Sequence, residues 1–220
     1  MDISTELRDL VARSTTSSVC DILMRRGLKL FMKQRVRPLD PKSKMAGPAL
    51  TIERRPIATA PRSGGRSNAA MIEAVEGAPA GTVLVFNGHL DHEAALWGGL
   101  LAACGSRNGL GGVVADGPVR DPLEILELKQ PCFCTGSVPA GQAGILTLGE
   151  IGVPLMCGGI VVHPGDFVFG DSNGVVVIPQ GQELEILREA VIVEERDQEA
   201  ARMILSGKSL EETMKALGRV

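Results

Sequence analysis

The feature that most constrains the fold of this chain is a short apolar run, residues 113–115. It follows two glycines and ends at the Asp-Gly-Pro turn signal of 116–118. An apolar run of this length before such a turn predicts a buried strand. Just beyond the turn the chain presents three charged residues, Arg120, Asp121 and Glu124. Open α/β sheets bind their ligands at the carboxyl ends of their strands, so these charges mark the candidate functional site.

Two interpretations of this charged turn remain open. The guanidinium of Arg120 is a planar fork that matches a carboxylate or an enolate oxygen. The carboxylate of Asp121 is a hard oxygen ligand that suits Mg²⁺ or Mn²⁺. The alternative is a structural role, a salt-bridged turn that caps the following helix, because surface ion pairs are common.

Composition limits the class of protein. With 220 residues, of which 44% are hydrophobic, the chain can bury a substantial core in one large domain or two small ones. The 27 glycines and 13 prolines, beside 3% aromatic residues, predict a β-rich core of aliphatic side chains with many turns. The net charge of −3 gives no electrostatic case for nucleic-acid binding. The sequence contains no apolar run of about 18 residues, so we expect no membrane span. The acidic, polar N-terminus does not resemble a secretory signal.

The cysteines and histidines predict neither a disulfide framework nor a zinc site. The five cysteines are odd in number and include no Cys-x-x-Cys pair. We therefore expect reduced thiols, mostly in or near the core, in a cytoplasmic protein. The three histidines, His89, His92 and His163, form no pair at i, i+4 spacing.

Hydrophobic periodicity and turn residues predict the order of the elements. Helices are expected over 4–24 (with a break at 15–18 and a second helix from about Val19), over 68–75, from Ala94 onward, over 123–128 and over 182–218 with a break at Gly207. Strands are expected over 49–54, 82–86, 113–115 and 131–135, within 155–162, and as a hairpin across 162–179. Segment 33–43 is expected to be an exposed connection, 61–67 a basic loop of unknown role, and 136–144 a glycine-rich loop.

Three aspartates are expected to have structural roles. Asp21 falls in the first turn expected for the second N-terminal helix, where a carboxylate interacts favourably with the helix dipole. Asp166 and Asp171 flank the turns of the expected hairpin, and aspartate is a natural turn former.

Gly98 and Gly99 lie at or near the start of the helix expected after Ala94. The first amides of a helix lack partners and the dipole adds positive potential, so bare backbone there can bind an anion. Close packing of a helix against a sheet also favours glycine, and the pair alone leaves both explanations open.

Three motifs, taken together, resemble one family. They are Gly-Gly-Leu-Leu-Ala at 98–102, Ala-Asp-Gly-Pro-Val-Arg-Asp at 115–121, and the hairpin sequence that begins Pro-Gly-Asp-Phe at 164–179. In these motifs the chain is similar to the RraA-like family, which includes the 4-hydroxy-4-methyl-2-oxoglutarate aldolases and the regulator of ribonuclease E activity. The likeness runs from about Thr15 to the C-terminus.

The resemblance implies an α/β fold of the swivelling β/β/α type. We expect one such domain over residues 1–220, with an N-terminal helical segment over 1–30 and C-terminal helices over 182–220. The long terminal helix is expected to pack on a neighbouring subunit, and the resemblance implies a homotrimer or a homohexamer.

The resemblance also assigns roles to residues of the charged turn. It implies a divalent metal, Mg²⁺ or Mn²⁺, held directly by Asp121, with Arg120 binding the 2-keto oxygen and stabilising the enolate. The backbone amides of four residues would hold the substrate carboxylate: Gly98, Gly99, Leu100 and Leu101. A glutamate from the neighbouring subunit would reach the metal through a water; Glu195 is the best match, with Glu194 and Glu199 close by.

One position departs from the aldolases. Their aspartate directly after the tryptophan–glycine pair, with twenty residues between it and the motif arginine, is Gly99 in this chain. The missing carboxylate predicts weaker aldol cleavage or a different substrate. Compensating groups are expected in the preceding loop, from His89, Asp91, His92 or Glu93.

The expected function is that of a metal-dependent (class II) lyase acting on small 2-keto acids. Aldol cleavage of 4-hydroxy-4-methyl-2-oxoglutarate and decarboxylation of oxaloacetate pass through the same pyruvate enolate, so a metal and an arginine aimed at the developing oxyanion lower both barriers. The alternative is a non-catalytic RraA-like regulator that binds a ribonuclease or a helicase. Methyl transfer lacks support because no glycine-rich nucleotide loop follows the first strand.

Overall fold

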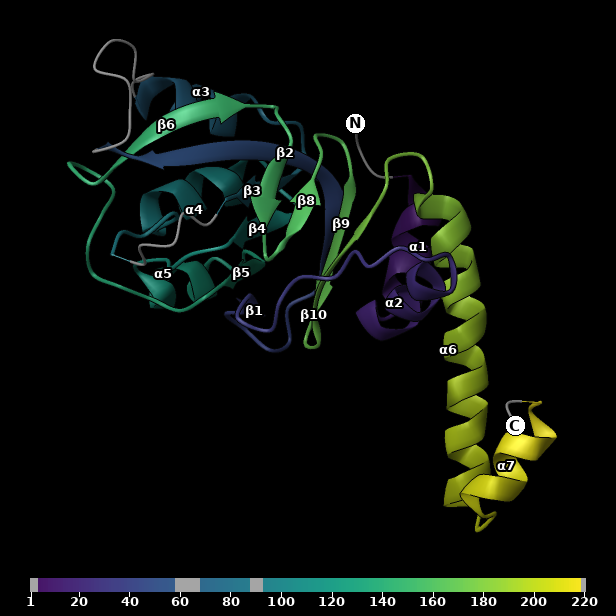
Figure 1. Cartoon of the computed structure of the whole chain (residues 1–220). Helices are drawn as coiled ribbons and strands as arrows, with labels where there is room; N and C mark the ends of the chain where they lie inside the picture. Colours follow the sequence, from purple (N-terminus) through teal and green to yellow (C-terminus); the bar gives the residue numbers. More distant parts are fainter. Residues whose placement is uncertain (1–3, 58–67, 88–92, 219–220) are drawn as a thin grey trace.

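The computed structural model describes residues 4–57, 68–87 and 93–218 (Figure 1). The helices are α1 (Thr5–Arg13), α2 (Thr16–Arg25), α3 (Asn68–Gly77), α4 (Gly99–Arg107), α5 (Pro122–Glu127), α6 (Glu183–Leu205) and α7 (Leu210–Ala216). The strands are β1 (Arg37–Pro38), β2 (Met45–Pro56), β3 (Val83–Phe86), β4 (Gly112–Ala115), β5 (Cys132–Cys134), β6 (Leu146–Ile151), β7 (Leu155–Cys157), β8 (Ile160–Val162), β9 (Phe167–Asp171) and β10 (Gly174–Ile178).

One large mixed sheet organises the molecule. Its strand order is β1-β5-β4-β3-β2-β9-β10, and β6 also pairs with β2. Strands β2 to β5 are mutually parallel, whereas β1, β6, β9 and β10 pair antiparallel to their neighbours. The two ends of this order meet, because Arg37 of β1 donates to the carbonyls of Ser172 (3.1 Å) and Asn173 (2.8 Å) in the β9–β10 turn. The sheet is therefore nearly closed and barrel-like, and the expected α/β fold is confirmed.

The parallel strands are buried on both faces. All four residues of β3 are inaccessible, and successive side chains point to opposite faces of a strand. Val83 and Val85 pack inside the barrel, whereas Leu84 and Phe86 pack outward against α3, α4 and α5. Each such side chain contributes about 1.5–3 kcal/mol through burial of its apolar surface. This two-sided core holds the carboxyl ends of β3 and β4 rigidly under the candidate site.

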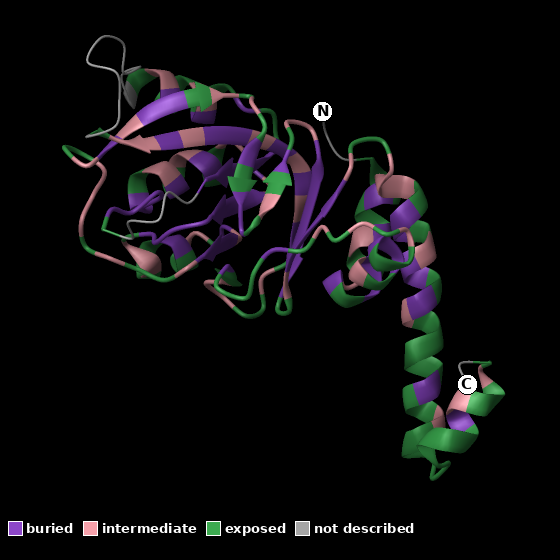
Figure 2. Cartoon of the chain, in the orientation of Figure 1, coloured by how far each residue is buried: buried purple, intermediate pink, exposed green. Residues whose placement is uncertain are grey.

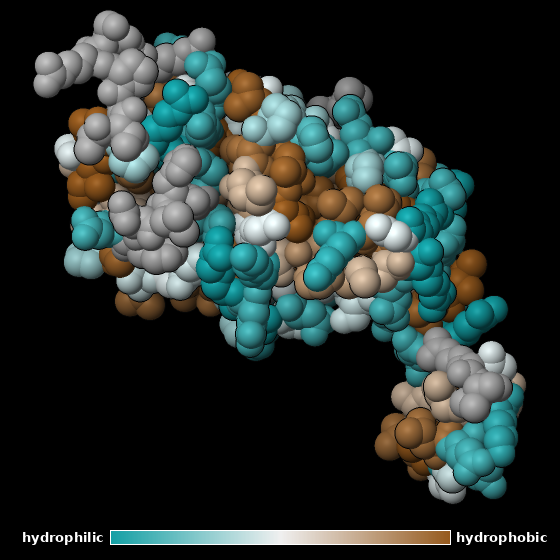
Figure 3. Space-filling view, in the orientation of Figure 1, coloured by the Kyte–Doolittle hydropathy of each residue, from teal (hydrophilic) through white to brown (hydrophobic). Residues whose placement is uncertain are grey.

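A second helical layer covers the β9–β10 end of the sheet. Helices α1, α2 and the first half of α6 pack together there, and Asp171 of β9 accepts hydrogen bonds from Thr16 N (2.8 Å) and Thr16 Oγ1 (2.6 Å) at the start of α2. The second half of α6 and α7 project away from this layer (Figures 1 and 2). Leu205 at the end of α6 and Leu210 at the start of α7 are exposed. Figure 3 shows apolar surface at the far end of this projection.

Most predicted elements are confirmed, but two helices begin at other residues than predicted. Helix α2 begins at Thr16 rather than near Val19, because Thr15 is its N-cap and forms a capping box with Ser18. The prediction that Asp21 lies in the first turn is therefore wrong. Helix α4 begins at Gly99 rather than Ala94, because residues 94–97 form a buried irregular segment.

Two further predictions are corrected by long-range contacts. Segment 33–43 is not simply an exposed connection, because Val36 is buried and Arg35 forms an ion pair with the buried Asp116. Strand β6 (Leu146–Ile151) was not predicted, and region 155–162 holds two short strands that form a hairpin.

Other predictions from the sequence hold. The hairpin of β9 and β10 forms as expected, and Asp166 accepts from the backbone amides of His163 and Gln180, which confirms its turn role. All five cysteines are free thiols. In the described parts of the chain, no helix combines the length and the apolar character that crossing a membrane requires.

Candidate active site

The candidate site forms where three connecting segments run side by side beyond the parallel strands. Single bridges link Trp97 to Val119 and Val119 to Ser137, both in parallel orientation. The amide of Arg120 donates to Trp97 O at 3.0 Å, which continues this alignment to the charged turn. Backbone hydrogen bonds therefore fix the position of residue 120 before any side-chain contact is considered.

Asp121 is held in an unusual backbone conformation at the start of α5. Its φ of 55° and ψ of 47° are left-handed, a region that aspartate tolerates better than most residues. Asp121 occupies the N-cap position, yet its side chain makes no capping hydrogen bond to α5. Its Oδ2 accepts instead from Gly99 N of α4 at 3.1 Å and lies 3.3 Å from Arg120 Nε. The salt bridge expected from the sequence is present, but the expected capping of the following helix is not.

The start of α4 faces the same carboxylate. Gly98 is the N-cap of α4, and a Cβ placed on it would lie 2.8 Å from Arg120 Cγ, so glycine permits the close approach of the arginine stem. Gly99, Leu100 and Leu101 form the first turn, whose amides have no acceptor within the helix. The structure thus brings together the glycine pair and the Arg–Asp pair that the sequence predicted separately.

Glu124 of α5 occupies the space beside Gly99. A Cβ placed on Gly99 would lie 1.8 Å from Glu124 Oε2 and 3.4 Å from Asp121 Cβ. The carboxylate of Glu124 therefore stands where an aspartate at position 99 would place its side chain. The sequence indicated Glu124 as part of the charged turn, but its relation to Gly99 depends on the packing of α5 against α4.

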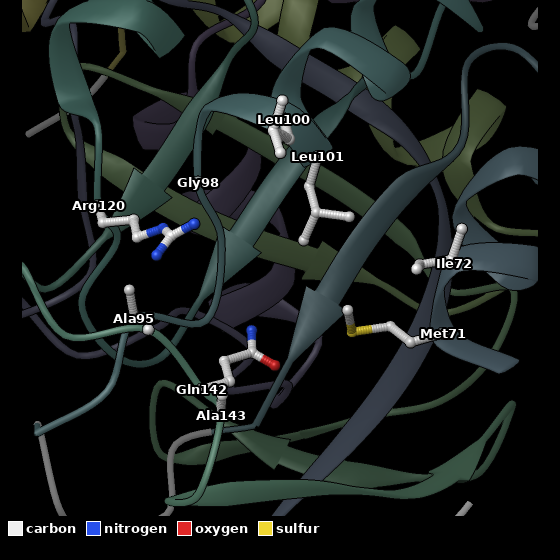
Figure 4. Close-up of a pocket in the computed structure, with 10 residues that line it drawn as sticks. Met71, Ile72, Ala95, Gly98, Leu100, Leu101, Arg120, Gln142 and Ala143 are labelled. Carbon is white, nitrogen blue, oxygen red and sulfur yellow. The ribbon is translucent and has the colours of Figure 1, made fainter. Parts of the chain in front are cut away.

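A cavity of about 340 Å³ opens beside Arg120 (Figure 4). Its described lining residues come from α3, from α4 and the segment before it, from the turn before α5, and from the loop between β5 and β6. They are Met71, Ile72, Ala95, Gly98, Leu100, Leu101, Arg120, Gly141, Gln142 and Ala143. Gly141 lies against the guanidinium, since a Cβ there would be 2.9 Å from Arg120 Nη1. Gln142 Nε2 donates to Leu96 O at 2.8 Å.

A buried arginine lies behind the cavity wall. Arg54 of β2 is only 1% exposed, and its Nη1 is 3.5 Å from Sδ of the lining residue Met71. Burial lowers the pKa of Arg54 to about 10, so the guanidinium remains charged at neutral pH. No functional role was predicted for Arg54, because it ended an ordinary alternating strand pattern.

Other sequence candidates lie elsewhere. Glu195 and its neighbours sit on α6, which covers the opposite end of the sheet from α4 and α5 (Figure 1). Within the chain, Arg13 pairs with Glu195 at 2.6 Å and Thr15 donates to Glu194 at 3.0 Å. The proposed replacements in 88–92 and the basic loop 61–67 lie outside the described residues, and Glu93 is exposed.

The potential metal ligands beside Arg120 are carboxylate oxygens, which are hard ligands. The contacts of Asp121 given above use Oδ2, which leaves Oδ1 for another partner, and Glu124 adds a second carboxylate close by. Among the described residues, no three His, Cys, Asp or Glu side chains converge as a complete metal site. One or two carboxylates with the remaining positions taken by water suit Mg²⁺, which keeps several waters when bound to protein.

Comparisons with known proteins identify the family. The family model described as "RraA-like: Aldolase/RraA" matches residues 16–177. A Halalkalibacterium halodurans protein named "Putative 4-hydroxy-4-methyl-2-oxoglutarate aldolase" is 33% identical over 171 residues, covering 77% of this chain and 76% of that protein.

Solved structures agree with this match. An uncharacterized protein from Pseudomonas syringae pv. tomato superimposes with a TM-score of 0.84 at 25% identity, covering 97% of this chain and 98% of that one. Streptomyces coelicolor RraAS2, described as an unusual member of the RNase ES inhibitor RraA protein family, gives a TM-score of 0.78 at 29% identity, covering 92% and 98%. This chain belongs to the RraA-like family.

Proposed function

We propose that this protein is a divalent-metal-dependent lyase of 2-oxo acids that acts through a pyruvate enolate. Its reactions would be aldol cleavage of the 4-hydroxy-4-methyl-2-oxoglutarate type, decarboxylation of oxaloacetate, or both. The observation that carries the proposal is that Arg120 and the first turn of α4 line one cavity, and that Asp121 contacts both of them. The name of the H. halodurans relative supports the same class of reaction.

Asp121 is the residue that would hold the metal, with Glu124 near enough to act on its water shell. A bound Mg²⁺ or Mn²⁺ would act as a Lewis acid and stabilise negative charge on the 2-oxo oxygen. The contact between Gly99 N and Asp121 Oδ2 fixes the carboxylate before any ligand arrives, and Arg120 Nε supports the same oxygen. A preorganised carboxylate loses little conformational freedom when it binds a cation.

Arg120 would bind the 2-oxo oxygen and stabilise the enolate as negative charge develops on it. The guanidinium lies between the Gly98 backbone and Gly141, which limits the positions it can adopt. Donors that are already aimed at a developing oxyanion lower the barrier without reorganising during the reaction. The amides of Leu100 and Leu101 in the first turn of α4 would hold the substrate carboxylate, as helix N-termini do for anions.

Glu124 supplies a carboxylate in place of the aspartate that the aldolases carry at position 99. Its Oε2 occupies the side-chain space next to Gly99, so the absence of that aspartate does not leave the site without a second acid. We propose that Glu124 accepts and returns the proton of a hydrogen-bonded water during cleavage.

The test is pyruvate release, coupled to lactate dehydrogenase, from oxaloacetate and from 4-hydroxy-4-methyl-2-oxoglutarate. Assays with Mg²⁺, Mn²⁺ and EDTA are corrected for decarboxylation by metal alone. Arg120→Ala is expected to lower turnover about 10²–10³-fold, the usual cost of removing one oxyanion donor. Arg107→Ala, at the exposed end of α4, is the matched control. Metal-independent release, or an unchanged rate in Arg120→Ala, would contradict the proposal.

We also propose that the protein assembles as a homotrimer or a homohexamer through the α6–α7 arm. Leu205 is 87% exposed and Leu210 is 64% exposed at the end of this arm, so both are available to a neighbouring subunit. In such an assembly Glu195 of one subunit would approach the metal of the next through a water. Light scattering of the protein and of a Leu205→Glu, Leu210→Glu variant tests this, and a monomer in both cases would contradict it.

A non-catalytic regulator remains the second candidate function. The description of the S. coelicolor neighbour as a member of an RNase ES inhibitor family favours it. Capture of a purified ribonuclease or helicase that persists in Asp121→Ala, together with no pyruvate release, would support this role over the lyase.

A further inference from the structure

We infer that the cavity beside Arg120 accepts a 2-oxo acid that carries one carboxylate and an apolar group at its distal carbon. This inference rests on the proposed function and specifies its substrate class. Oxaloacetate and 4-hydroxy-4-methyl-2-oxoglutarate are both dicarboxylates, and the cavity favours a different distal half.

The cavity wall opposite Arg120 is apolar. Met71 and Ile72 project from α3 and Leu101 from α4, and these three side chains lie across the cavity from the guanidinium (Figure 4). Among the described residues that line the cavity, Arg120 is the only one with a charged side chain. A carboxylate moved from water against such a wall would lose part of its hydration without gaining a charged partner among the described residues, which is unfavourable.

The polar groups gather at one end of the cavity. Arg120 and the first turn of α4 would engage the 2-oxo acid part of the ligand, as proposed above. Gln142 donates through Nε2 to Leu96 O at 2.8 Å, and this bond fixes the plane of its amide. The amide oxygen of Gln142 is an acceptor that suits the hydroxyl of a 4-hydroxy-2-oxo acid and disfavours a second carboxylate.

The buried Arg54 does not offset this bias. Arg54 is 1% exposed and lies behind Met71, with its Nη1 3.5 Å from the thioether sulfur. Met71 lines the cavity, whereas Arg54 does not. A distal carboxylate would have to displace the Met71 side chain before it could hydrogen bond to Arg54.

The volume fits a ligand of this class. A cavity of about 340 Å³ lies at the lower end of the range for small-molecule sites. It accommodates the pyruvyl part of a substrate and a short branched alkyl group. In the reaction, the C3–C4 bond breaks and the 4-hydroxyl gives its proton to a base, so that its carbon becomes the carbonyl of an apolar aldehyde or ketone. The electron pair passes to the pyruvate enolate, which takes up a proton at C3 and leaves as pyruvate.

The first test compares two substrates that differ at one group. They are 4-hydroxy-4-methyl-2-oxoglutarate and 4-hydroxy-4,5-dimethyl-2-oxohexanoate, in which an isopropyl group replaces the distal carboxylate. We expect kcat/KM, counted per C–C bond broken, to be at least about tenfold higher for the isopropyl compound, given the cost of an unpaired polar group in a pocket. A preference for the dicarboxylate would overturn the inference and leave the proposed lyase intact. Absence of metal-dependent pyruvate release from both compounds and from oxaloacetate would overturn the proposed function and, with it, the inference.

The second test adds a cation to the apolar wall. Ile72→Arg changes a lining side chain that is 45% exposed, so the substitution carries little folding cost. Val161→Arg is the matched control, because Val161 is β-branched, 41% exposed and located on β8 rather than in the cavity. We expect Ile72→Arg to shift the ratio of the two kcat/KM values at least tenfold toward the dicarboxylate and Val161→Arg to leave it unchanged. An unchanged ratio in a folded Ile72→Arg protein would overturn the assignment of this wall to the distal group.

Discussion

The six residues that follow the end of β4 begin and end with an aspartate, and each aspartate pairs with an arginine in a different environment. At the start of this segment, Asp116 is 2% exposed and accepts two hydrogen bonds from the guanidinium of Arg35, at 2.8 and 2.6 Å. It also accepts from Gly158 N at 2.8 Å. At the second end, Asp121 is 37% exposed, and its contacts with Arg120 Nε and Gly99 N both fall on Oδ2.

The difference separates a structural carboxylate from a functional one. Both oxygens of Asp116 are engaged by donors of this chain, so a ligand would have to break existing bonds. Asp121 keeps one oxygen for another partner, and Arg120 is 44% exposed beside a cavity. The buried pair anchors one end of the turn so that the exposed pair at the other end stays in place for binding.

The largest expected effect is on stability, from Asp116→Ala. Removing one member of a buried ion pair leaves the other uncompensated, and we expect the free energy of unfolding to fall by about 3 kcal/mol. This value is at the low end of the usual range because Arg35 is 38% exposed and can turn toward water. Urea unfolding measures it. The Asp121→Asn variant should lose less than about 1 kcal/mol, and equal losses in the two variants would contradict the distinction.

The second prediction concerns metal affinity and uses Asp121→Asn. Asparagine tolerates the left-handed backbone of this position, and its amide oxygen still accepts from Gly99 N. Loss of the negative charge should weaken Mg²⁺ or Mn²⁺ binding by at least the roughly 10–100-fold that outer-shell changes cost. Titration calorimetry measures this, with Asp21→Asn on the exposed face of α2 as the control. Unchanged binding in Asp121→Asn would remove it from the metal site.

Local signals were enough to predict much of the fold. The β9–β10 hairpin followed from turn residues between two runs of aromatic and β-branched residues. The start of α2 was predicted three residues too late, because the capping box of Thr15 with Ser18 was not recognised. Strand β6 was missed because its formation depends on pairing with β2, where Arg54 lies opposite Leu148. The buried role of Arg35 was missed for the same reason, since its partner is 81 residues away.

The candidate site was predictable to a similar extent. Arg120, Asp121 and the glycines at 98–99 were identified from their position after a strand and before a helix, and the structure brings them into contact. The cavity wall was not predictable, because Met71 and Ile72 reach it from a helix of another region. The Glu124 carboxylate beside Gly99 also depends on how two helices pack, which no local pattern encodes.

The third prediction tests whether Glu124 completes the exposed pair. In Gly99→Asp the new Cβ would lie 1.8 Å from Glu124 Oε2, so the two carboxylates compete for one space. We expect the single variant to lose about tenfold in aldol cleavage, since like charges disfavour each other. Adding Glu124→Ala should relieve the conflict and raise cleavage of 4-hydroxy-4-methyl-2-oxoglutarate above the single variant. A gain from Gly99→Asp alone, of the same size as in the double variant, would show that Glu124 does not occupy this role.

The smallest expected effects come from replacing each arginine with lysine, which keeps the charge and removes the fork. Arg35→Lys can retain one of the two hydrogen bonds to Asp116, so the free energy of unfolding should fall by only about 1 kcal/mol. Its kcat/KM should not change. Arg120→Lys should leave stability unchanged, because the pair is exposed, and lower kcat/KM about tenfold, because an ammonium cannot reproduce a planar fork at the enolate. If Arg35→Lys lowered kcat/KM as much as Arg120→Lys, the two pairs would act as one unit, and the turn between them would transmit strain rather than isolate the site from its anchor.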